Sequence, residues 1–258
     1  MYRFIKRLFD FLVALIAIVI FSPFFVILPI LIALFIGNPI LFKQKRIGRY
    51  NKIFNLYKFR SMNDKKDSEG NLLPDEQRLT AFGKVLRKSS LDELPQLFSI
   101  LVGNMSIVGP RPKTIEETFF IKDTKYIYRH CVRPGITGLA IIKGRNELNP
   151  DKAFRIDLEY VANNGFWMDF KIFIKTFLVV LFKKGITSKN HVTFVPHYQF
   201  WKENGLLTPE KIYDLRSEAK AISLSNAKYI EGVSRLQFET NRKQLINKYK
   251  LRGKKNGN

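Results

Sequence analysis

The longest hydrophobic stretch of the chain lies near its N-terminus, where residues 11–42 contain no charged side chain. A helix needs roughly 20 apolar residues to cross a bilayer, so this stretch is longer than one span and too short for two spans with a turn. It is interrupted at Ser22 and Pro23, and a proline removes a helical hydrogen bond and clashes with the preceding turn. The pattern predicts two helices within residues 1–42 with a break at Ser22-Pro23.

Positive charges flank the hydrophobic stretch on both sides, within residues 3–7 and again within residues 43–49. Because cytoplasmic flanks carry the excess of Lys and Arg, both ends are expected in the cytoplasm. Two cytoplasmic ends and one break favour a re-entrant membrane hairpin, in which the Ser22 hydroxyl would serve a backbone group freed at the break. A single tilted transmembrane helix and a cleaved signal peptide are the alternatives. Asp10 is expected near the interface, within ion-pairing distance of Lys6 or Arg7.

The pattern after the hydrophobic stretch predicts a mainly α fold with small β elements over residues 43–190. Residues 53–60 show a partial alternation of apolar and polar side chains, which is typical of a short strand. Thr80 is a candidate N-cap for a helix through Arg87. Leucines and Phe98 recur at spacings of three and four residues and predict a helix over 90–101, which Gly103 would end.

Further along, two Gly/Pro-rich turns are predicted at residues 108–112 and 133–138. Residues 151–183 are predicted to be largely helical. Residues 191–258 form a basic C-terminal extension of unknown role with fair helical propensity. Within it, residues 206–258 hold 12 Lys and Arg against 5 Asp and Glu, so we expect a segment that is amphipathic or binds a partner.

The composition narrows the function classes. The 258 residues carry a formal net charge of +22, which indicates an anionic partner: nucleic acid, anionic lipid or a phosphorylated small molecule. The single cysteine, Cys131, excludes an intramolecular disulfide and a cysteine-based zinc cluster, and the three histidines lack metal-ligand spacing. The chain contains no P-loop and no G-x-G-x-x-G fingerprint, so an NTPase or a dinucleotide enzyme is poorly supported.

The adjacent carboxylates Asp92 and Glu93 are the sharpest candidates for chemistry. Ser90 and Glu93 have the spacing of a helix capping box, which is the structural interpretation. In the functional interpretation, a helix N-terminus keeps Asp92 ionised as a nucleophile. Glu93 then supplies an oxygen ligand to Mg2+, and carboxylate attack on phosphorus is established covalent chemistry.

Many cations accompany this pair, as phosphoryl transfer requires for positioning and charge neutralisation. Arginine forks match phosphate oxygens, although each of these side chains taken alone could be a solvated surface charge. The candidate phosphate-binding residues are Lys58, Arg60, Arg87, Lys88, Arg111, Arg133 and Arg145.

Ordered motifs over roughly residues 3–190 resemble those of the bacterial sugar transferases, the monotopic phosphoglycosyl transferases that start glycan assembly on polyprenyl phosphate. The matching residues are Lys6-Arg7 with Asp10, Ser22-Pro23, Phe42-x-Gln44-x-Arg46-x-Gly48, residues 58–62, residues 91–97, Met105-Ser106-x-Val108-Gly109-Pro110-Arg111-Pro112, residues 132–138, and Gly144-Arg145.

The resemblance implies a mechanism. Asp92 would attack the β-phosphate of a UDP-sugar, release UMP and hold the sugar phosphate until polyprenyl phosphate takes it, while Glu93 helps to hold Mg2+. Lys58, Arg87 and Arg111 match basic family positions expected to contact phosphates. Asp169 matches a functional family carboxylate, with a helix N-cap as the structural alternative.

The resemblance also implies a location and partners. A cytosolic transferase domain over residues 43–190 would stand on a membrane-embedded hairpin over residues 1–42, at the cytoplasmic face of the bacterial inner membrane. The expected partners are a UDP-sugar, polyprenyl phosphate and membrane lipid, and no nucleic acid, since no nucleic-acid-reading module is recognisable. A homodimer is left open. Polysaccharide or glycoprotein glycan assembly would follow the reaction.

Two departures from the family pattern concern local polar contacts. Ile141 replaces a glutamine that usually precedes the Gly-Arg motif, and Gly165 stands where the family often has a serine. Two rival functions are kept: a non-catalytic, membrane-anchored basic protein, and a glycosyltransferase that moves only the sugar and releases UDP.

Overall fold

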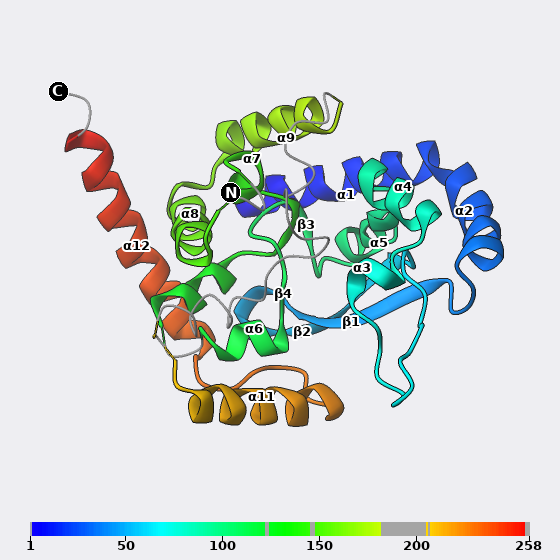
Figure 1. The fold of residues 1–258 in the computed structure, drawn as a ribbon. Coiled ribbons are helices and arrows are strands. Elements are labelled where there is room, and N and C mark those ends of the chain that lie inside the picture. Colours follow the sequence, from blue (N-terminus) through cyan, green and yellow to red (C-terminus); the bar gives the residue numbers. More distant parts are fainter. Residues whose placement is uncertain (1, 122–123, 145–147, 182–204, 206, 256–258) are drawn as a thin grey trace.

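The computed structural model describes residues 2–121, 124–144, 148–181, 205 and 207–255. The fold is mainly helical, with a small sheet between two groups of helices (Figure 1), which confirms the predicted fold class. Five helices lie on one side of the sheet: α1 (Tyr2–Ile20), α2 (Ser22–Phe35), α4 (Ala81–Ser89), α5 (Gln96–Leu101) and α9 (Phe166–Leu181). On the other side lie α6 (Ile115–Phe119) and α11 (Pro209–Leu224).

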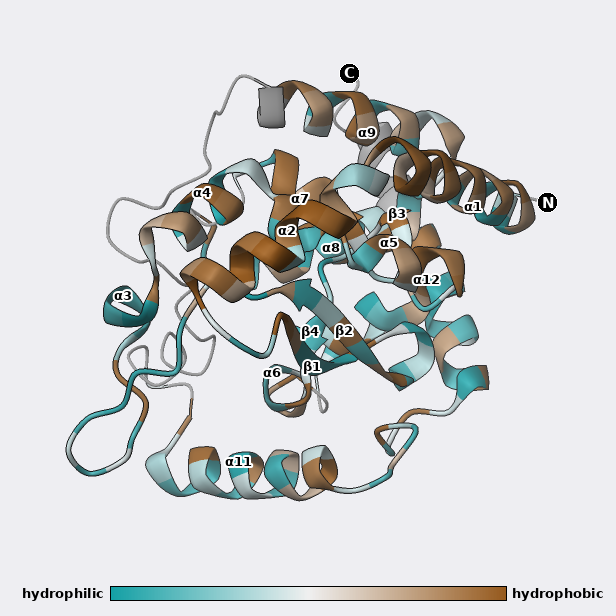
Figure 2. Ribbon diagram, turned by 90° about the vertical axis from the view of Figure 1, so that its right-hand side faces the viewer, coloured by the Kyte–Doolittle hydropathy of each residue, from teal (hydrophilic) through white to brown (hydrophobic). Residues whose placement is uncertain are grey.

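The hydrophobic N-terminal stretch folds into α1 and α2, which meet at Phe21 with a bend of 60°. The Ser22 hydroxyl donates a hydrogen bond of 2.8 Å to the carbonyl of Val19, so it satisfies a backbone group at the break, as predicted. Figure 2 shows that α2 and the second half of α1 are hydrophobic, whereas the first half of α1 also carries charged residues. Taken singly, none of the described helices is long and apolar enough to cross a bilayer, whereas the bent pair together could be, by length and composition.

The sheet is built on an antiparallel hairpin of β1 (Leu41–Ile47) and β2 (Ile53–Phe59), in which Leu41 lies opposite Phe59. The predicted strand at 53–60 is therefore confirmed as β2. The short strand β4 (Lys113–Thr114) pairs antiparallel with the free edge of β1. The hairpin turn contains the 3-10 helix η1 (Arg49–Asn51), in which Tyr50 and Asn51 adopt left-handed backbone conformations.

The two segments predicted as Gly/Pro turns pack directly against each other. The first follows the strand β3 (Ser106–Val108), but the turn predicted at 133–138 is wrong in its centre, because Gly135–Thr137 form the strand β5, which pairs parallel with β3. A Cβ atom on Gly109 would lie 2.4 Å from the carbonyl oxygen of Arg133, and one on Gly135 would lie 2.1 Å from the amide nitrogen of Gly109. Only glycine allows this approach of backbone to backbone, so both glycines are required where the two segments meet.

The segment after β2 departs from the sequence prediction. Thr80 caps α4 by accepting a hydrogen bond from the amide of Gly83, as predicted, and α4 runs to Ser89. The predicted helix over 90–101 is wrong in its first half: Ser90 is left-handed, the 3-10 turn η2 (Leu91–Glu93) follows, and α5 begins only at Gln96. Pro95 explains the break, because its ring clashes with the carbonyl four residues earlier in an α-helix.

The remaining elements complete the domain. The predicted helical region 151–183 is confirmed as α8 (Pro150–Asn163) and α9, separated at Asn164 and Gly165. The short elements are α3 (Asp75–Arg78), η3 (Lys125–Cys131) and α7 (Leu139–Ile142). Buried side chains of α1, α2, β2, α4, α5, β3, α8 and α9 form one continuous hydrophobic core.

Buried carboxylates attach α1 to the domain. Asp10 is 1% exposed and accepts hydrogen bonds from the Ser106 hydroxyl (3.1 Å) and the Ile107 amide (3.0 Å) of β3. The expected ion pair of Asp10 with Lys6 or Arg7 is wrong. Lys6 pairs with Asp169 of α9 at 2.5 Å, and Arg7 donates to the carbonyls at the end of α5. Lys6 and Arg7 bind these partners instead of Asp10 because α1 is packed between β3, α5 and α9.

The C-terminal extension packs onto the domain through α11 and α12 (Arg235–Lys255). The α11 side chains Ile212 and Leu215 are buried in a second core cluster beneath the sheet, with α6. Phe238 of α12 is fully buried among side chains of η3 and α8. The backbone between these helices also bonds to the β1–β2 turn: the Ile53 amide donates to the carbonyl of Lys228 at 2.8 Å.

Phe238→Ala should lower the free energy of unfolding by about 3–5 kcal/mol, because it leaves a cavity where the extension meets the domain. The matched control is Leu236→Ala on the same helix, whose side chain is 77% exposed and whose loss should change stability by about 0.5 kcal/mol or less. Thermal unfolding of the purified protein in detergent compares the two variants. Equal effects would mean that the buried contact of α12 does not contribute to stability.

Candidate active site

Asp92 and Glu93 lie in the η2 turn, between the end of α4 and the start of α5. The left-handed Ser90 turns the chain sharply out of α4, and the turn packs against β2, so Asp92 is buried at 8% exposure. The Ser90 side chain caps no backbone amide here. The capping box expected from the Ser90–Glu93 spacing is therefore wrong, because an N-cap residue needs an extended backbone and Ser90 is left-handed.

Three of the predicted cations surround the two carboxylates. Lys58 of β2 pairs with Glu93 Oε1 at 2.5 Å, and Arg111 from the turn after β3 reaches the same oxygen at 3.2 Å. Arg87, in the last turn of α4, donates to the Ser61 hydroxyl at 2.9 Å and lies close enough to interact electrostatically with Asp92. The structure thus brings Lys58, Arg87 and Arg111, from three separate elements, to one pair of carboxylates.

The pKa of Asp92 is raised from 3.8 to about 6. Burial is the main cause, and the neighbouring negative charge of Glu93 adds to it, while Lys58, Arg87 and Arg111 act in the opposite direction. The sequence led us to expect that a helix N-terminus would favour the ionised form of this carboxyl. The structure provides no such helix end, although a pKa of about 6 leaves Asp92 mostly ionised at pH 7. A three-residue 3-10 turn offers little helix dipole, whereas desolvation and a like charge both penalise the ionised form.

Asp92 and Glu93 differ in their partners. Glu93 is engaged by two cations, whereas no described side chain donates a hydrogen bond or forms an ion pair with the Asp92 carboxylate. Burial without a partner is costly for a carboxylate. The Asp92 carboxylate is therefore buried with hydrogen-bonding capacity that the described residues do not use.

A buried ion pair positions Arg111. Arg129 of η3 is 2% exposed and donates to Asp157 of α8 at 2.8 Å, and its guanidinium also donates to the carbonyl of Arg111 at 2.6 Å. Sequence analysis missed Arg129 and Asp157, because nothing in their spacing relates them to the Asp92–Glu93 pair, called the dyad below. It also missed Ser61, although Ser61 lies within the motif that contains Lys58.

On α4, the close approach of Gly83 explains how Arg87 reaches Ser61. A Cβ on Gly83 would lie 1.8 Å from the Ser61 carbonyl oxygen, so the first turn of α4 packs against the backbone after β2. This contact holds Arg87 beside the dyad.

The other predicted substrate-binding residues lie elsewhere. Arg60 is 7% exposed and bonds to the carbonyls of Asn38 and Met62 and to Asp64, so it fixes the chain between α2 and β1. Arg133 donates to the Gly103 carbonyl at 2.8 Å, and its charged neighbours are Arg49, Arg7 and Asp10 rather than the dyad. Arg145 lies outside the described residues.

Asp169 is buried at 8% exposure and accepts hydrogen bonds from Tyr2 and Lys6 of α1 and from Tyr160 of α8, the last at 2.8 Å. It is not a helix N-cap, because its amide donates to the carbonyl of Gly165 four residues earlier. Asp169 therefore joins three helices at one buried point. Desolvation and the Asp169 charge raise the pKa of Tyr160 well above its ordinary value, so its hydroxyl stays protonated and donates.

The dyad is compatible with Mg2+. The described residues contain no cluster of three or more side chains of the metal-ligating types. Mg2+, however, is usually held by one or two carboxylates together with substrate phosphates. Asp92, buried and without a described partner, and the adjacent Glu93 offer such a pair. Burial is the main cause of the raised pKa of Asp92, and a divalent cation would offset the smaller contribution from the Glu93 charge.

The family model of the bacterial sugar transferases matches residues 1–183 of this chain. The uncharacterized sugar transferase EpsL of Bacillus subtilis is 47% identical over 189 residues, which are 73% of this chain and 93% of that protein. A UDP-N-acetylgalactosamine-undecaprenyl-phosphate N-acetylgalactosaminephosphotransferase of Aeromonas hydrophila is 41% identical over 187 residues, 70% of this chain and 44% of its own.

A third relative is a UDP-glucose:undecaprenyl-phosphate glucose-1-phosphate transferase of Xanthomonas campestris, 37% identical over 173 residues, which are 60% of this chain and 36% of that protein. The chain thus spans almost all of EpsL and less than half of the Aeromonas and Xanthomonas relatives. It belongs to the bacterial sugar transferase family, as the motifs indicated.

The raised pKa of Asp92 predicts that Asp92→Asn stabilises the protein at pH 8. The pKa of Asp92 is about 6 in the folded protein and 3.8 in the unfolded chain. The free energy of unfolding therefore falls as the pH rises between these values, and above this interval the ionised carboxylate lowers it by about 2–3 kcal/mol. The substitution removes that cost, so the unfolding midpoint at pH 8 should rise. Asp214→Asn, on an exposed position of α11, is the control and should change stability by about 0.5 kcal/mol or less. A lower midpoint for Asp92→Asn would contradict the assignment.

Proposed function

We propose that this protein is a phosphoglycosyl transferase, which moves a sugar 1-phosphate from a UDP-sugar to polyprenyl phosphate through a covalent intermediate on Asp92. The observation that carries the proposal is the Asp92–Glu93 pair itself: one buried carboxylate without a described partner, next to another held by Lys58 and Arg111. Membership of the sugar transferase family and the undecaprenyl-phosphate phosphotransferases among its relatives support the same reaction class.

In the first half-reaction, an Asp92 oxygen attacks the β-phosphorus of the UDP-sugar. The new bond joins the carboxylate oxygen to phosphorus, the bond between this phosphorus and the bridging oxygen breaks, and UMP leaves with the electron pair. Attack requires the ionised carboxylate, so the fraction of active enzyme falls as the pH drops below the pKa of Asp92. Lys58, Arg87 and Arg111 orient the diphosphate and offset the charge that develops on its oxygens.

In the second half-reaction, an oxygen of polyprenyl phosphate attacks the same phosphorus. The acyl phosphate bond to Asp92 breaks, the carboxylate returns to its initial state, and a polyprenyl diphosphate sugar is formed. Mg2+, when bound by Asp92, Glu93 and the substrate phosphates, would offset their negative charge. Arg129 and Asp157 contribute by positioning the turn that carries Arg111.

A membrane location suits this acceptor. Large apolar side chains are exposed along α1 and α2, among them Phe4, Val19, Leu34 and Phe35, each more than 60% exposed. Burying such a surface in lipid is favourable. The bend at Phe21 and the basic flanks fit a hairpin that enters the cytoplasmic leaflet and returns. The dyad would then lie at the level of the acceptor's phosphate, where the UDP-sugar arrives from the cytoplasm.

The nucleotide product separates this proposal from its rivals. Purified protein is incubated with Mg2+, polyprenyl phosphate and a panel of UDP-sugars; we expect UMP release that needs the lipid for multiple turnovers. Asp92→Asn should lower the rate at least about a thousandfold, because the nucleophile is lost, whereas Asp214→Asn should leave it unchanged. UDP release would instead assign a glycosyltransferase. Unaltered turnover by Asp92→Asn would exclude the covalent mechanism.

The hairpin proposal predicts that both ends of the α1–α2 pair face the same side of the membrane. A cleavable tag fused before residue 1 and a cysteine introduced at Glu69, in the exposed loop after β2, should both be accessible in inverted vesicles and protected in right-side-out vesicles. Opposite accessibility of the two sites would indicate a full span. Replacing Ser22 and Pro23 together by leucine should favour that outcome, because the break loses its proline and its hydroxyl partner.

A further inference from the structure

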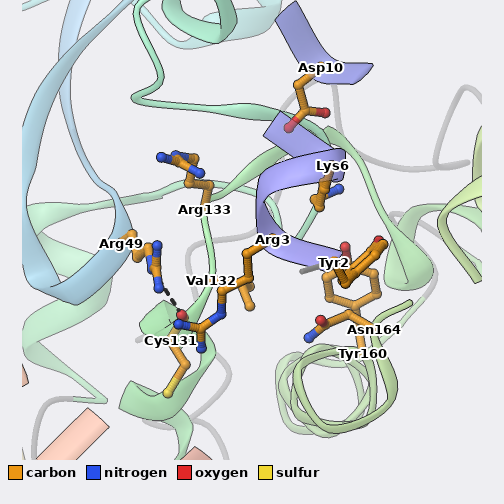
Figure 3. Close-up of a pocket in the computed structure, with 10 residues that line it drawn as sticks. All are labelled: Tyr2, Arg3, Lys6, Asp10, Arg49, Cys131, Val132, Arg133, Tyr160 and Asn164. Atoms are coloured by element: carbon orange, nitrogen blue, oxygen red, sulfur yellow. Dashed lines mark hydrogen bonds between the residues drawn. The ribbon is translucent and has the colours of Figure 1, made fainter. Parts of the chain in front are cut away.

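A second basic site lies at the start of α1, apart from the dyad. A shallow pocket that is open to solvent lies there, and its charged lining residues are Arg3, Lys6, Asp10, Arg49 and Arg133. Figure 3 shows Arg49 and Arg133 on one side, Tyr2, Tyr160 and Asn164 on the other, and Arg3 and Lys6 between them. None of these residues contacts Asp92 or Glu93 in the described hydrogen bonds and ion pairs.

The cations of this pocket are unequally neutralised. Lys6 pairs with Asp169, and Arg3 and Arg49 share Glu239 of α12. The described contacts give Arg133 a single hydrogen bond, from its Nε to the Gly103 carbonyl. Arg49 and Arg7 repel it electrostatically, and Asp10 attracts it. The terminal nitrogens of Arg133 therefore remain available for an anion.

The neighbouring Arg3 already binds a carboxylate, that of Glu239. Glu239 accepts two hydrogen bonds of 2.9 Å from the two terminal nitrogens of Arg3, and it also bonds to Tyr50. A guanidinium that binds a carboxylate through two parallel bonds presents the same geometry to two phosphate oxygens. Because α12 lies beyond the residues matched by the family model, this carboxylate is supplied by the extension rather than by the shared domain.

The opposite end of the pocket carries a negative charge. Asp10 uses Oδ1 for Ser106 and Ile107, and its Oδ2 is enclosed by the protein without a partner among the described residues. A ligand does not reach this enclosed oxygen, but the Asp10 carboxylate repels an anion. An anion in the pocket is therefore held at the arginine end.

The helix that carries Arg3 and Lys6 also indicates where the pocket would lie relative to a membrane surface. Phe4 and Leu8, on the neighbouring face of α1, are 76% and 52% exposed, so this turn would enter the acyl boundary if α1 lies in a membrane. The cations on the same turn then lie at the level of lipid headgroups, where each positive charge attracts anionic lipid. This step rests on the membrane association argued under the proposed function.

We propose that this pocket binds the phosphodiester headgroup of an anionic phospholipid, such as phosphatidylglycerol, on Arg133, Arg3 and Arg49. The extension regulates access, because Glu239 competes with the phosphate for Arg3 and Arg49. The extension thereby links the lipid surface to the position of α1, since α12 holds both the pocket arginines and, through Phe238, the core.

Native mass spectrometry of the full-length protein, released from detergent micelles that contain phosphatidylglycerol, tests the site directly. We expect one bound phosphatidylglycerol per protein, and occupancy about tenfold lower for Arg133→Gln, since a charge-assisted contact is lost. The matched control is Arg155→Gln, whose side chain on α8 is 66% exposed and does not line the pocket; it should bind as the unmodified protein does. Glu239→Gln should raise the occupancy several-fold.

Two further ligands identify the source of the phosphate. Phosphatidylcholine, whose headgroup has no net charge, should not compete with phosphatidylglycerol. Glycerol 3-phosphate should not compete either, and competition by this soluble phosphate ester would overturn the assignment to lipid. Equal lipid binding by Arg133→Gln and Arg155→Gln would overturn the site. The binding assay needs no turnover, so the two proposals fail separately. Loss of lipid binding with normal UMP release would overturn only the lipid site, and lipid binding without UMP release would overturn only the proposed reaction.

Discussion

Two adjacent carboxylates held out of water are the constraint on which the catalytic side of this protein depends. Burial and mutual repulsion raise the pKa of Asp92 to about 6, and the folded chain tolerates this because Lys58 and Arg111 pair with Glu93 and because Arg87 lies nearby. Each of these cations requires an element of its own: a strand, a turn and the end of a helix. The small sheet and the short helices around it are the means of bringing them together.

The same use of buried carboxylates joins the hydrophobic hairpin to the domain. Asp10 bonds to β3 and Asp169 bonds to α1 and α8, so the first helix is attached by polar contacts as well as by packing. An apolar helix in contact with lipid gains little from further apolar contacts with protein, because lipid is equally apolar. Directional hydrogen bonds to buried acids therefore specify how α1 lies against the catalytic domain.

The C-terminal extension is a further part of the folded domain. Although the family model ends at residue 183, α11 and α12 are packed into the domain rather than tethered to it. Phe238 fills the core between η3 and α8, and Glu239, the next residue, reaches Arg3 at the start of α1. Neighbouring residues of one helix thus contact the core and the first helix, so a segment outside the region matched by the family model is joined to both.

The sequence by itself determined the features that depend on local chemistry. The uncharged hydrophobic stretch and its interruption at Ser22-Pro23 predicted the bent helix pair. Thr80 predicted the cap of α4, and the ordered motifs indicated the family and the Asp92–Glu93 pair. Only the tertiary structure decided the rest. Lys6 pairs with Asp169, 163 residues away along the chain, rather than with the nearby Asp10. Arg60 and Arg133 bind backbone carbonyls away from Asp92. The pKa of Asp92 also followed from burial rather than from the helix end. Local propensity is fixed by neighbours along the chain, whereas the partner of a charged side chain is fixed by which distant elements pack against it, and that is a property of the whole fold.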